Sequence, residues 1–342
     1  MTSRDDEQMK ISLASKVLQD RTPEVVVDLA ATLGYGGIEW FCLPQHLPPD
    51  VPSERVAALD SRTRDAGLET VCLSTYAGGF ADLDEAGCSE QLRLFARYVE
   101  LALQLGCPLL RLWPDTMGKT LRAPVSDSQI DRVAHYFRRA ADCAAAAGVC
   151  VAVEMHQTIG VDVQLLVRLL EAASRSNVGV IYDPGNVYLA KRPYGREAIG
   201  PLAERILHVQ LKEASLRRPT PPHLADEPAL RLGGDFDLLI GEGEVDFEMV
   251  IAALNEIGYT GWYSVECHAL PRPGMDSASI AAAELTSVRN MLPPRVHNRG
   301  ARRRNGASHA ALDVVGGNAP TAPRYPRTSE IPASSRTRTL DL

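Results

Sequence analysis

Four apolar runs in the second half of the chain contain or end in residues of the kind that bind metals. The runs are V-A-V-E, V-I-Y-D, I-L-H-V-Q-L and Y-S-V-E, and they supply Glu154, Asp183, His208 and Glu266. Buried carboxylates without a counter-charge are expelled or protonated. A divalent cation resolves that conflict, and mixed carboxylate and imidazole ligation suits Mn²⁺, Mg²⁺, Co²⁺, Ni²⁺ or Zn²⁺. The four residues therefore predict one bound divalent metal ion.

Each of the four residues also has a structural interpretation when it is taken alone. An aspartate before Pro-Gly, such as Asp183, is typical of a turn. His208 lies inside an apolar run, where a histidine is more often a hydrogen-bonded core residue. Glu154 and Glu266 have fewer structural explanations, because each ends a strand-like apolar run. The four together, each at its own strand end, favour the metal site.

Five further residues are predicted to bind a substrate beside the metal. Side chains alternate between the two faces of a strand, so polar residues two positions apart share a face. For Glu39 the rival interpretation is a salt bridge in a loop, and Trp113 is expected to form a wall of the pocket. The predicted substrate-binding residues are Glu39, Trp113, His156, Asn186 and Lys212.

The segments that carry these residues follow one repeating pattern. A glycine after a helical stretch, a short apolar run and then polar residues recur, as in L-G-Y-G-G-I-E-W (33–40) and A-G-V-C-V-A-V-E-M-H (147–156). Glycine is expected after the last helical turn, because it adopts the left-handed conformation without a Cβ clash. The pattern predicts strands that alternate with helices.

Eight such strand-then-helix units can be counted, beginning with M-K-I-S-L-A-S at 9–15. Eight units predict an α/β fold, a (β/α)8 TIM barrel with its active site at the carboxyl ends of the strands. A doubly wound open sheet is the alternative, although no G-x-G-x-x-G follows an early strand. The expected strand ends lie near residues 15, 40, 74, 113, 155, 183, 211 and 267.

Two regions depart from the repeat within or after the expected barrel domain, residues 9–292. Residues 214–245 are a long insertion rich in Pro, Arg and Gly, and a loop of that length is usually functional, often a lid. Its G-E-G at 241–243 resembles a phosphate-binding loop only weakly. Residues 293–342 have no apolar periodicity and are predicted to be a disordered basic tail.

Composition excludes some classes of partner. The net charge of the chain is −7. Residues 293–342 contain nine arginines and only three acidic residues, so the net charge of the barrel domain is more negative than that of the whole chain. A nucleic-acid partner normally requires a basic face. No stretch approaches the roughly 20 apolar residues of a membrane-spanning helix. Seven scattered cysteines and a polar N-terminus indicate reduced thiols and a cytoplasmic location.

Several motifs together resemble the sugar isomerase/epimerase superfamily, which has a xylose isomerase-like barrel. That superfamily includes ketose 3-epimerases, hydroxypyruvate isomerase, inosose dehydratase and, more distantly, endonuclease IV. The resemblance implies that Glu154, Asp183, His208 and Glu266 bind the metal, and that Glu154 and Glu266 are the acid/base pair. The motifs are V-E-M-H (153–156), Y-D-P-G-N (182–186), H-V-Q-L-K-E (208–213), G-E-G-E-V-D-F (241–247) and S-V-E (264–266).

Some positions depart from the superfamily's pattern. The seventh strand there usually reads H-V-H-x-K-D, whereas Gln210 and Glu213 stand here in place of the second His and the Asp. Endonuclease IV would have a D-x-H ahead of G-E-G, where this chain has Asp237, and a histidine in place of Asn186. The missing histidines remove ligands of a three-metal cluster, so a mononuclear site is expected.

The expected activity is isomerisation or epimerisation of a small sugar or keto-polyol through an enediolate. The metal would act as a Lewis acid, while Glu154 and Glu266 move the proton beside the carbonyl. A lyase or dehydratase acting on an inosose or keto-sugar is the alternative. A DNA-repair endonuclease or a non-catalytic barrel is a third, opposed by the acidic body and by the intact acid/base pair. A homo-oligomer is left open.

Overall fold

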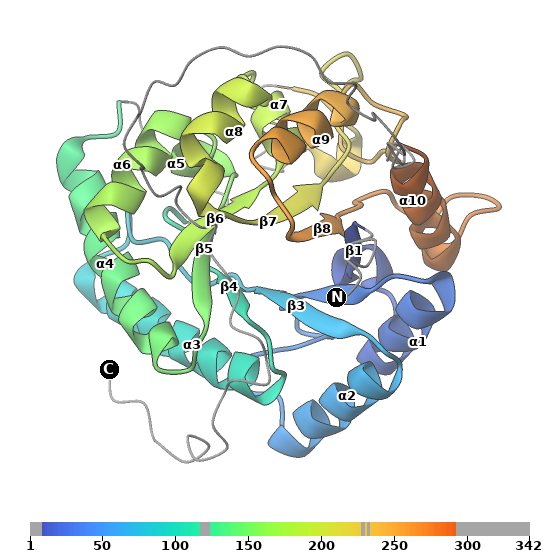
Figure 1. The fold of residues 1–342 in the computed structure, drawn as a ribbon, viewed down its shortest axis with the longest axis horizontal. Helices are drawn as coiled ribbons and strands as arrows, with labels where there is room; N and C mark the ends of the chain where they lie inside the picture. The colour runs from blue at the N-terminus through green and yellow to red at the C-terminus, as the bar shows by residue number, and fades with distance from the viewer. Residues whose placement is uncertain (1–8, 117–123, 227–229, 231–232, 292–342) are drawn as a thin grey trace, which may run out of the picture.

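Eight parallel strands close into a barrel in chain order, with β1 paired to β8 (Figure 1). The computed structural model describes residues 9–116, 124–226, 230 and 233–291. The predicted TIM barrel is confirmed, and the open sheet is excluded. The strands are β1 (Lys10–Ala14), β2 (Gly37–Phe41), β3 (Glu69–Ser74), β4 (Leu109–Arg111), β5 (Cys150–Glu154), β6 (Val178–Tyr182), β7 (Ile206–Leu211) and β8 (Trp262–Val265).

Helices surround the barrel and alternate with its strands (Figure 1). Two short helices, α5 (Gln157–Gly160) and α7 (Pro184–Leu189), directly follow β5 and β6 at the barrel mouth, the carboxyl end of the strands. The longer helices are α1 (Pro23–Leu33), α2 (Ser53–Asp65), α3 (Glu85–Gln104), α4 (Asp127–Ala145), α6 (Val163–Ala173), α8 (Arg196–Leu202), α9 (Phe247–Glu256) and α10 (Ser277–Met291). Single 3-10 turns are η1 (Ser15–Leu18), η2 (Ala203–Arg205) and η3 (Pro222–Leu224).

Local sequence signals fix the ends of these helices. The Ser126 hydroxyl accepts a hydrogen bond from the Gln129 backbone N–H, and the Gln129 side chain accepts from the Ser126 N–H, so α4 begins with a capping box. Pro23 begins α1, and Gly34 ends it at a φ of +92°. Thr22 occupies the expected N-cap position of α1, but its side chain makes no capping hydrogen bond.

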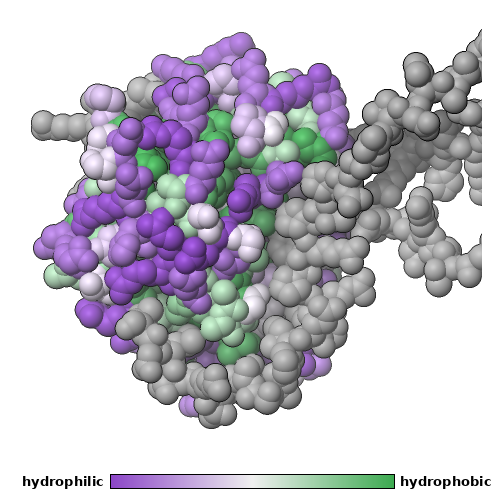
Figure 2. All heavy atoms as spheres, turned by 60° about the vertical axis from the view of Figure 1, so that its left-hand side comes forward, coloured by the Kyte–Doolittle hydropathy of each residue, from purple (hydrophilic) through white to green (hydrophobic). Residues whose placement is uncertain are grey.

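The apolar faces of the helices pack on the outside of the strands, and their outer faces are polar. Figure 2 shows one side of the molecule as mostly hydrophilic, with apolar side chains only in small areas between polar ones. Among the described residues, no helix has both the length and the apolar character that crossing a membrane requires. The predicted tail, residues 293–342, lies outside the described residues.

The described part of the insertion after β7 is held at its base by one carboxylate. Glu213 accepts hydrogen bonds from the backbone N–H groups of Gly241 at 2.8 Å, Ala214 at 2.9 Å and Val245 at 3.2 Å. A Cβ on Gly243 would lie 2.3 Å from a Glu213 oxygen. The N–H groups around G-E-G therefore bind a carboxylate of the chain itself, which argues against the weak expectation of a phosphate loop there.

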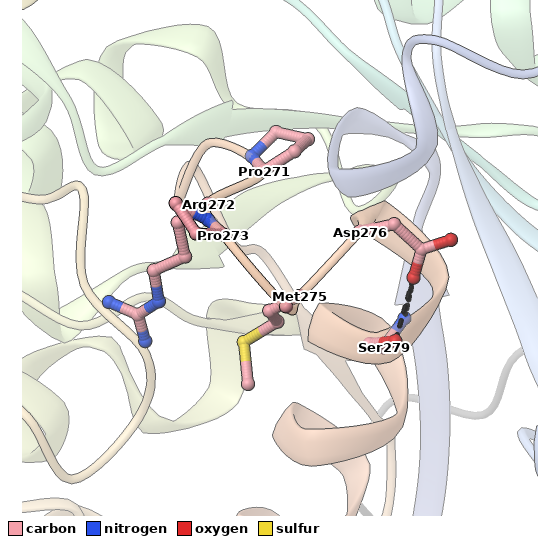
Figure 3. A pocket seen from close by; sticks show the side chains of 7 residues that line it. Pro271, Arg272, Pro273, Met275, Asp276 and Ser279 are labelled. Atoms are coloured by element: carbon pink, nitrogen blue, oxygen red, sulfur yellow. Dashed lines mark hydrogen bonds between the residues drawn. The ribbon is translucent and has the colours of Figure 1, made fainter.

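The loop between β8 and α10 forms an open hollow lined by residues 271–276 and Ser279 (Figure 3). Asp276 accepts hydrogen bonds from the Ser279 backbone N–H at 2.9 Å and hydroxyl at 2.7 Å, and so caps the start of α10. Further along α10, Glu284 is 1% exposed and accepts a hydrogen bond from the Ile240 N–H at 3.0 Å. This carboxyl group ties the insertion to the last helix.

Stability should fall with rising pH because of Glu284. Burial raises the pKa of this carboxyl from 4.5 to about 7. As pH rises, the unfolded chain releases the proton first, so stability is lost between about pH 4.5 and 7 and stays lost above. Glu284→Gln should match the wild type at pH 4 and exceed it by about 1–3 kcal/mol at pH 8 in urea denaturation. Glu54→Gln, an exposed change in α2, is the control, and equal stabilities at pH 8 would contradict the prediction.

Candidate metal centre

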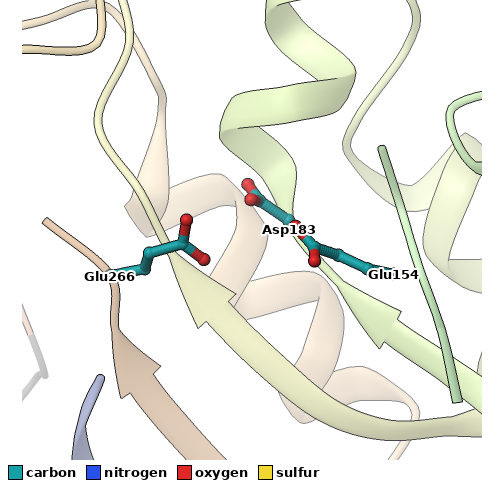
Figure 4. A group of neighbouring side chains, drawn as sticks. All are labelled: Glu154, Asp183 and Glu266. Carbon is teal, nitrogen blue, oxygen red and sulfur yellow. The ribbon is translucent and has the colours of Figure 1, made fainter. Parts of the chain in front are cut away.

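Three buried carboxylates meet at the barrel mouth (Figure 4). Glu154 is the last residue of β5, Asp183 follows β6, and Glu266 follows β8. One oxygen from each lies within 4.8 Å of the others, and none of the three residues is more than 3% exposed. In Figure 4 the Glu266 side chain points from β8 toward those of Glu154 and Asp183. Three of the four predicted ligands are thus within reach of one ion, and their binding a metal stays a prediction.

Asp183 is both a turn residue and a member of this cluster. Its Oδ1 accepts the Asn186 backbone N–H at 3.0 Å, which caps α7, and Pro184 occupies the first helical position. Its Oδ2 lies 2.6 Å from Asn186 Nδ2 and 3.0 Å from Lys212 Nζ. The structural and the functional interpretations of Asp183 are therefore compatible, because each uses a different oxygen.

Two buried cations balance the carboxylates. Lys212 Nζ lies 3.0 Å from Asp183 Oδ2 and 3.1 Å from Glu266 Oε1, and Lys212 is 3% exposed. Arg111 pairs with Glu154 through Nη1 and donates to the backbone oxygen of Thr75 at 3.0 Å. Lys212 and Asn186 are the two predicted substrate residues that touch the cluster directly.

The surroundings make the three carboxyl groups unequal. Burial, against the effect of Lys212, raises the pKa of Asp183 to about 7. Burial also raises the pKa of Glu154, although Arg111 opposes it. Burial alone would raise the pKa of Glu266 as well, but Lys212 and His268 lower it well below the ordinary value. Glu266 is the group that the protein itself holds ionised most firmly.

The residues present fit a divalent cation. Glu266 Oε2 and Asn186 Oδ1 are buried acceptor atoms without a hydrogen-bond partner. Unpartnered buried acceptors are rare and indicate an unfilled need for a donor or a cation. Carboxylate oxygens are the ligands that hard divalent ions such as Mg²⁺ and Mn²⁺ prefer. A metal held by Glu154, Asp183 and Glu266 would satisfy this need.

His208 and Glu39 pair with each other and are not part of the group of three carboxylates. His208 Nε2 is 3.1 Å from Glu39 Oε2, and Gln210 Nε2 donates to Glu39 Oε1 at 2.8 Å. His208 is absent from the group of described metal-ligating side chains that lie within 4.8 Å of one another. Its role as the fourth ligand, and that of Glu39 in substrate binding, stay predictions.

The remaining predicted residues, Trp113 and His156, are buried and pack against each other. The rings of Trp113 and His156 meet edge to face at 5.1 Å, and Trp113 Nε1 donates to the backbone oxygen of Thr75 at 2.9 Å. His156 is 6% exposed, and its Nδ1 has no hydrogen-bond partner. That Trp113 forms a wall of a substrate pocket stays a prediction.

Two further residues, Arg111 and His268, lie next to the cluster. Arg111 is enclosed by the rings of Phe41, Tyr76 and Trp113, with its guanidinium carbon 4.8–5.1 Å from their centres. His268 Nε2 lies 2.6 Å from Glu266 Oε1. The sequence signal for both is spacing, since each stands two positions from a predicted residue at the carboxyl end of a strand.

The sequence places the chain among known proteins. It belongs to the xylose isomerase-like TIM barrel family, whose model matches residues 27–290. The resemblance read from the motifs is thereby confirmed at the level of the family. The inosose dehydratase of Geobacillus kaustophilus (strain HTA426) is 26% identical over 272 residues, which cover 73% of this chain and 81% of that protein.

Solved structures share the fold at low identity. An L-ribulose 3-epimerase structure superposes with a TM-score of 0.67 at 20% identity and covers 83% of this chain and 95% of its own. The IOLI protein, solved with a binding zinc atom, has a TM-score of 0.69 at 18% identity and covers 83% of this chain and 98% of its own. At these identities the likeness shows the fold alone.

Asp183→Asn should weaken metal binding while the protein stays folded. The amide keeps the Oδ1 cap of α7 but removes one negative ligand, so affinity for Mn²⁺ should fall roughly 100-fold or more in calorimetry. Asp162→Asn is the matched control, because Asp162 caps α6 in the same way and is not part of the cluster. Unchanged affinity in Asp183→Asn would remove Asp183 from the site. His208→Gln, measured alongside, tests the fourth ligand by the same loss of affinity.

Arg111→Met should destabilise the fold because it leaves the Glu154 carboxylate buried and unpaired. Breaking a buried ion pair costs about 3–5 kcal/mol, which urea denaturation followed by circular dichroism will detect. The double variant Arg111→Met/Glu154→Gln should recover part of that loss, since the stranded charge is gone. Arg62→Met breaks an exposed pair with Asp28 and should cost about 1 kcal/mol or less. A similar cost for both arginines would contradict the assigned role of Arg111.

Proposed function

We propose that this chain is a divalent-metal-dependent isomerase or epimerase of a small sugar or keto-polyol. The observation that carries the proposal is the pair of buried carboxylates Glu154, which ends β5, and Glu266, which follows β8; they approach each other within 4.8 Å, and Glu266 points toward Glu154 in Figure 4. A substrate carbon between them would have one carboxylate on each face. Two bases on opposite faces are what removal and return of a proton require.

A metal held by Glu154, Asp183 and Glu266, with His208 as the predicted fourth ligand, would supply Lewis-acid polarisation of the substrate carbonyl when bound. The chain's own residues transfer the proton and orient the substrate. Glu154 and Glu266 move the proton on the carbon beside the carbonyl, through an enediolate. Asn186 and Lys212, whose side chains contact the carboxylates, would orient the substrate oxygens.

The two carboxylates differ in their access to water. His268 is bonded to Glu266 at 2.6 Å, and its side chain is 19% exposed, so it connects Glu266 to solvent. Glu154 is instead held by Arg111 and Asn186, which offer no comparable route. A proton taken by Glu266 should therefore exchange with solvent faster than one taken by Glu154.

A dehydratase is the second candidate, and the relationship to an inosose dehydratase favours it. The first step is the same removal of a proton beside a carbonyl. A hydroxide then leaves from the neighbouring carbon instead of a proton returning. An isomerase leaves the mass of the substrate unchanged, whereas a dehydratase product is lighter by one water and absorbs in the ultraviolet as an enone or enol.

Glu154→Gln and Glu266→Gln should each abolish turnover, because an amide can neither take nor return a proton. The assay is a panel of ketoses and inososes incubated in deuterated water with Mn²⁺. One variant should still exchange the substrate proton for deuterium without forming product, since it keeps the base on the face of that proton. Glu90→Gln, an exposed change in α3, is the control. Near-normal product from Glu266→Gln would leave Glu266 as a ligand only.

A further inference from the structure

The Lys212 ammonium group lies among the carboxylates that would hold the metal. Its Nζ is 3.0 Å from Asp183 Oδ2 and 3.1 Å from Glu266 Oε1, and Glu154 also acts on it. Burial alone would lower the pKa of Lys212, but the carboxylates raise it above its ordinary value. The lysine is therefore charged, and it already neutralises part of the cluster without any metal.

The backbone of Lys212 is fixed, so that only its side chain can make way for a second cation. A Cβ on Gly185 would lie 2.3 Å from the Lys212 carbonyl oxygen, which means that the start of α7 packs directly against this backbone. The side chain has a nearby alternative partner in Phe236, whose ring centre is 5.9 Å from Nζ. An ammonium group is attracted to the face of an aromatic ring.

We propose that Lys212 is a built-in cation that competes with the divalent metal for Asp183 and Glu266. Metal binding displaces the ammonium group from Asp183 Oδ2 toward Phe236, where it becomes available to a substrate oxygen. The inference rests on the proposed metal site. It assigns Lys212 a role that a lysine binding only substrate would not have, because it links the position of Lys212 to metal occupancy.

Competition predicts an effect on metal affinity opposite in sign to that of a ligand. Removing Lys212 leaves three buried carboxylates with one fewer positive neighbour, so the metal-free protein becomes less stable and the metal-bound protein is favoured. A lysine that merely supported the geometry of the site would weaken metal binding when removed. The sign of the change therefore separates the two roles.

The experiment is calorimetric titration of chelator-treated protein with Mn²⁺ alone, in the wild type, Lys212→Met and Lys10→Met. Lys10 begins β1, at the end of the barrel opposite the mouth, so its variant controls for the loss of one charge. Lys212→Met should bind Mn²⁺ at least about tenfold more tightly than the other two proteins. Its melting temperature without metal should be lower, and Mn²⁺ should raise it by more than in the wild type.

Each other outcome has a defined meaning. Equal or weaker binding by Lys212→Met, with a wild type that binds Mn²⁺, overturns the competition while the metal site stands. Absence of binding in all three proteins overturns both the inference and the proposed metal-dependent function. If Lys212→Met does not fold, the test uses the wild-type protein, whose lysine amines are labelled by reductive methylation with and without Mn²⁺. Mn²⁺ should increase the labelling of Lys212 several-fold, and unchanged labelling of Lys212 overturns the proposal.

Discussion

Negative charge buried at the barrel mouth has to be balanced, and the surroundings of β5 to β8 follow from that requirement. Glu154, Asp183 and Glu266 all face one small volume from which water is largely excluded. Each has a positively charged neighbour from another strand end, and the balance is still incomplete at Glu266 Oε2. A site of this kind attracts cations, whether the cation is a metal, a lysine or both.

The closed barrel allows the fold to tolerate this concentration of charge. Its parallel strands place one residue each at the same end, so no single strand carries more than one of these carboxylates. A large apolar cluster built by strands and helices together stabilises the chain. The charged groups of the mouth still contribute to stability through their pairing, as the buried Arg111–Glu154 pair does.

The barrel and the three carboxylates of the cluster could be predicted from the sequence, because both depend on local patterns. An apolar run ending in Glu154 or Glu266 indicates a strand and the position of its last side chain. The partners of these groups could not be predicted in the same way. Arg111 is 43 residues from Glu154, and Glu39 is 169 residues from His208. Pairing over such separations depends on how strands are staggered around the barrel, including the register shift between Val180 and Ile181.

The hydrogen bonds that Glu213 accepts at the base of the insertion act as a clamp, and they fix the two ends of the insertion independently of the segment between them. This carboxylate holds the chain at both ends of the insertion, at Ala214 on one side and at Gly241 and Val245 on the other. The segment between these points can change in length and sequence while the clamp keeps β7 and α9 where they are. None of the three carboxylates of the cluster lies in the segment between these points, so its exchange, in evolution or by design, would leave Glu154, Asp183 and Glu266 in the chain.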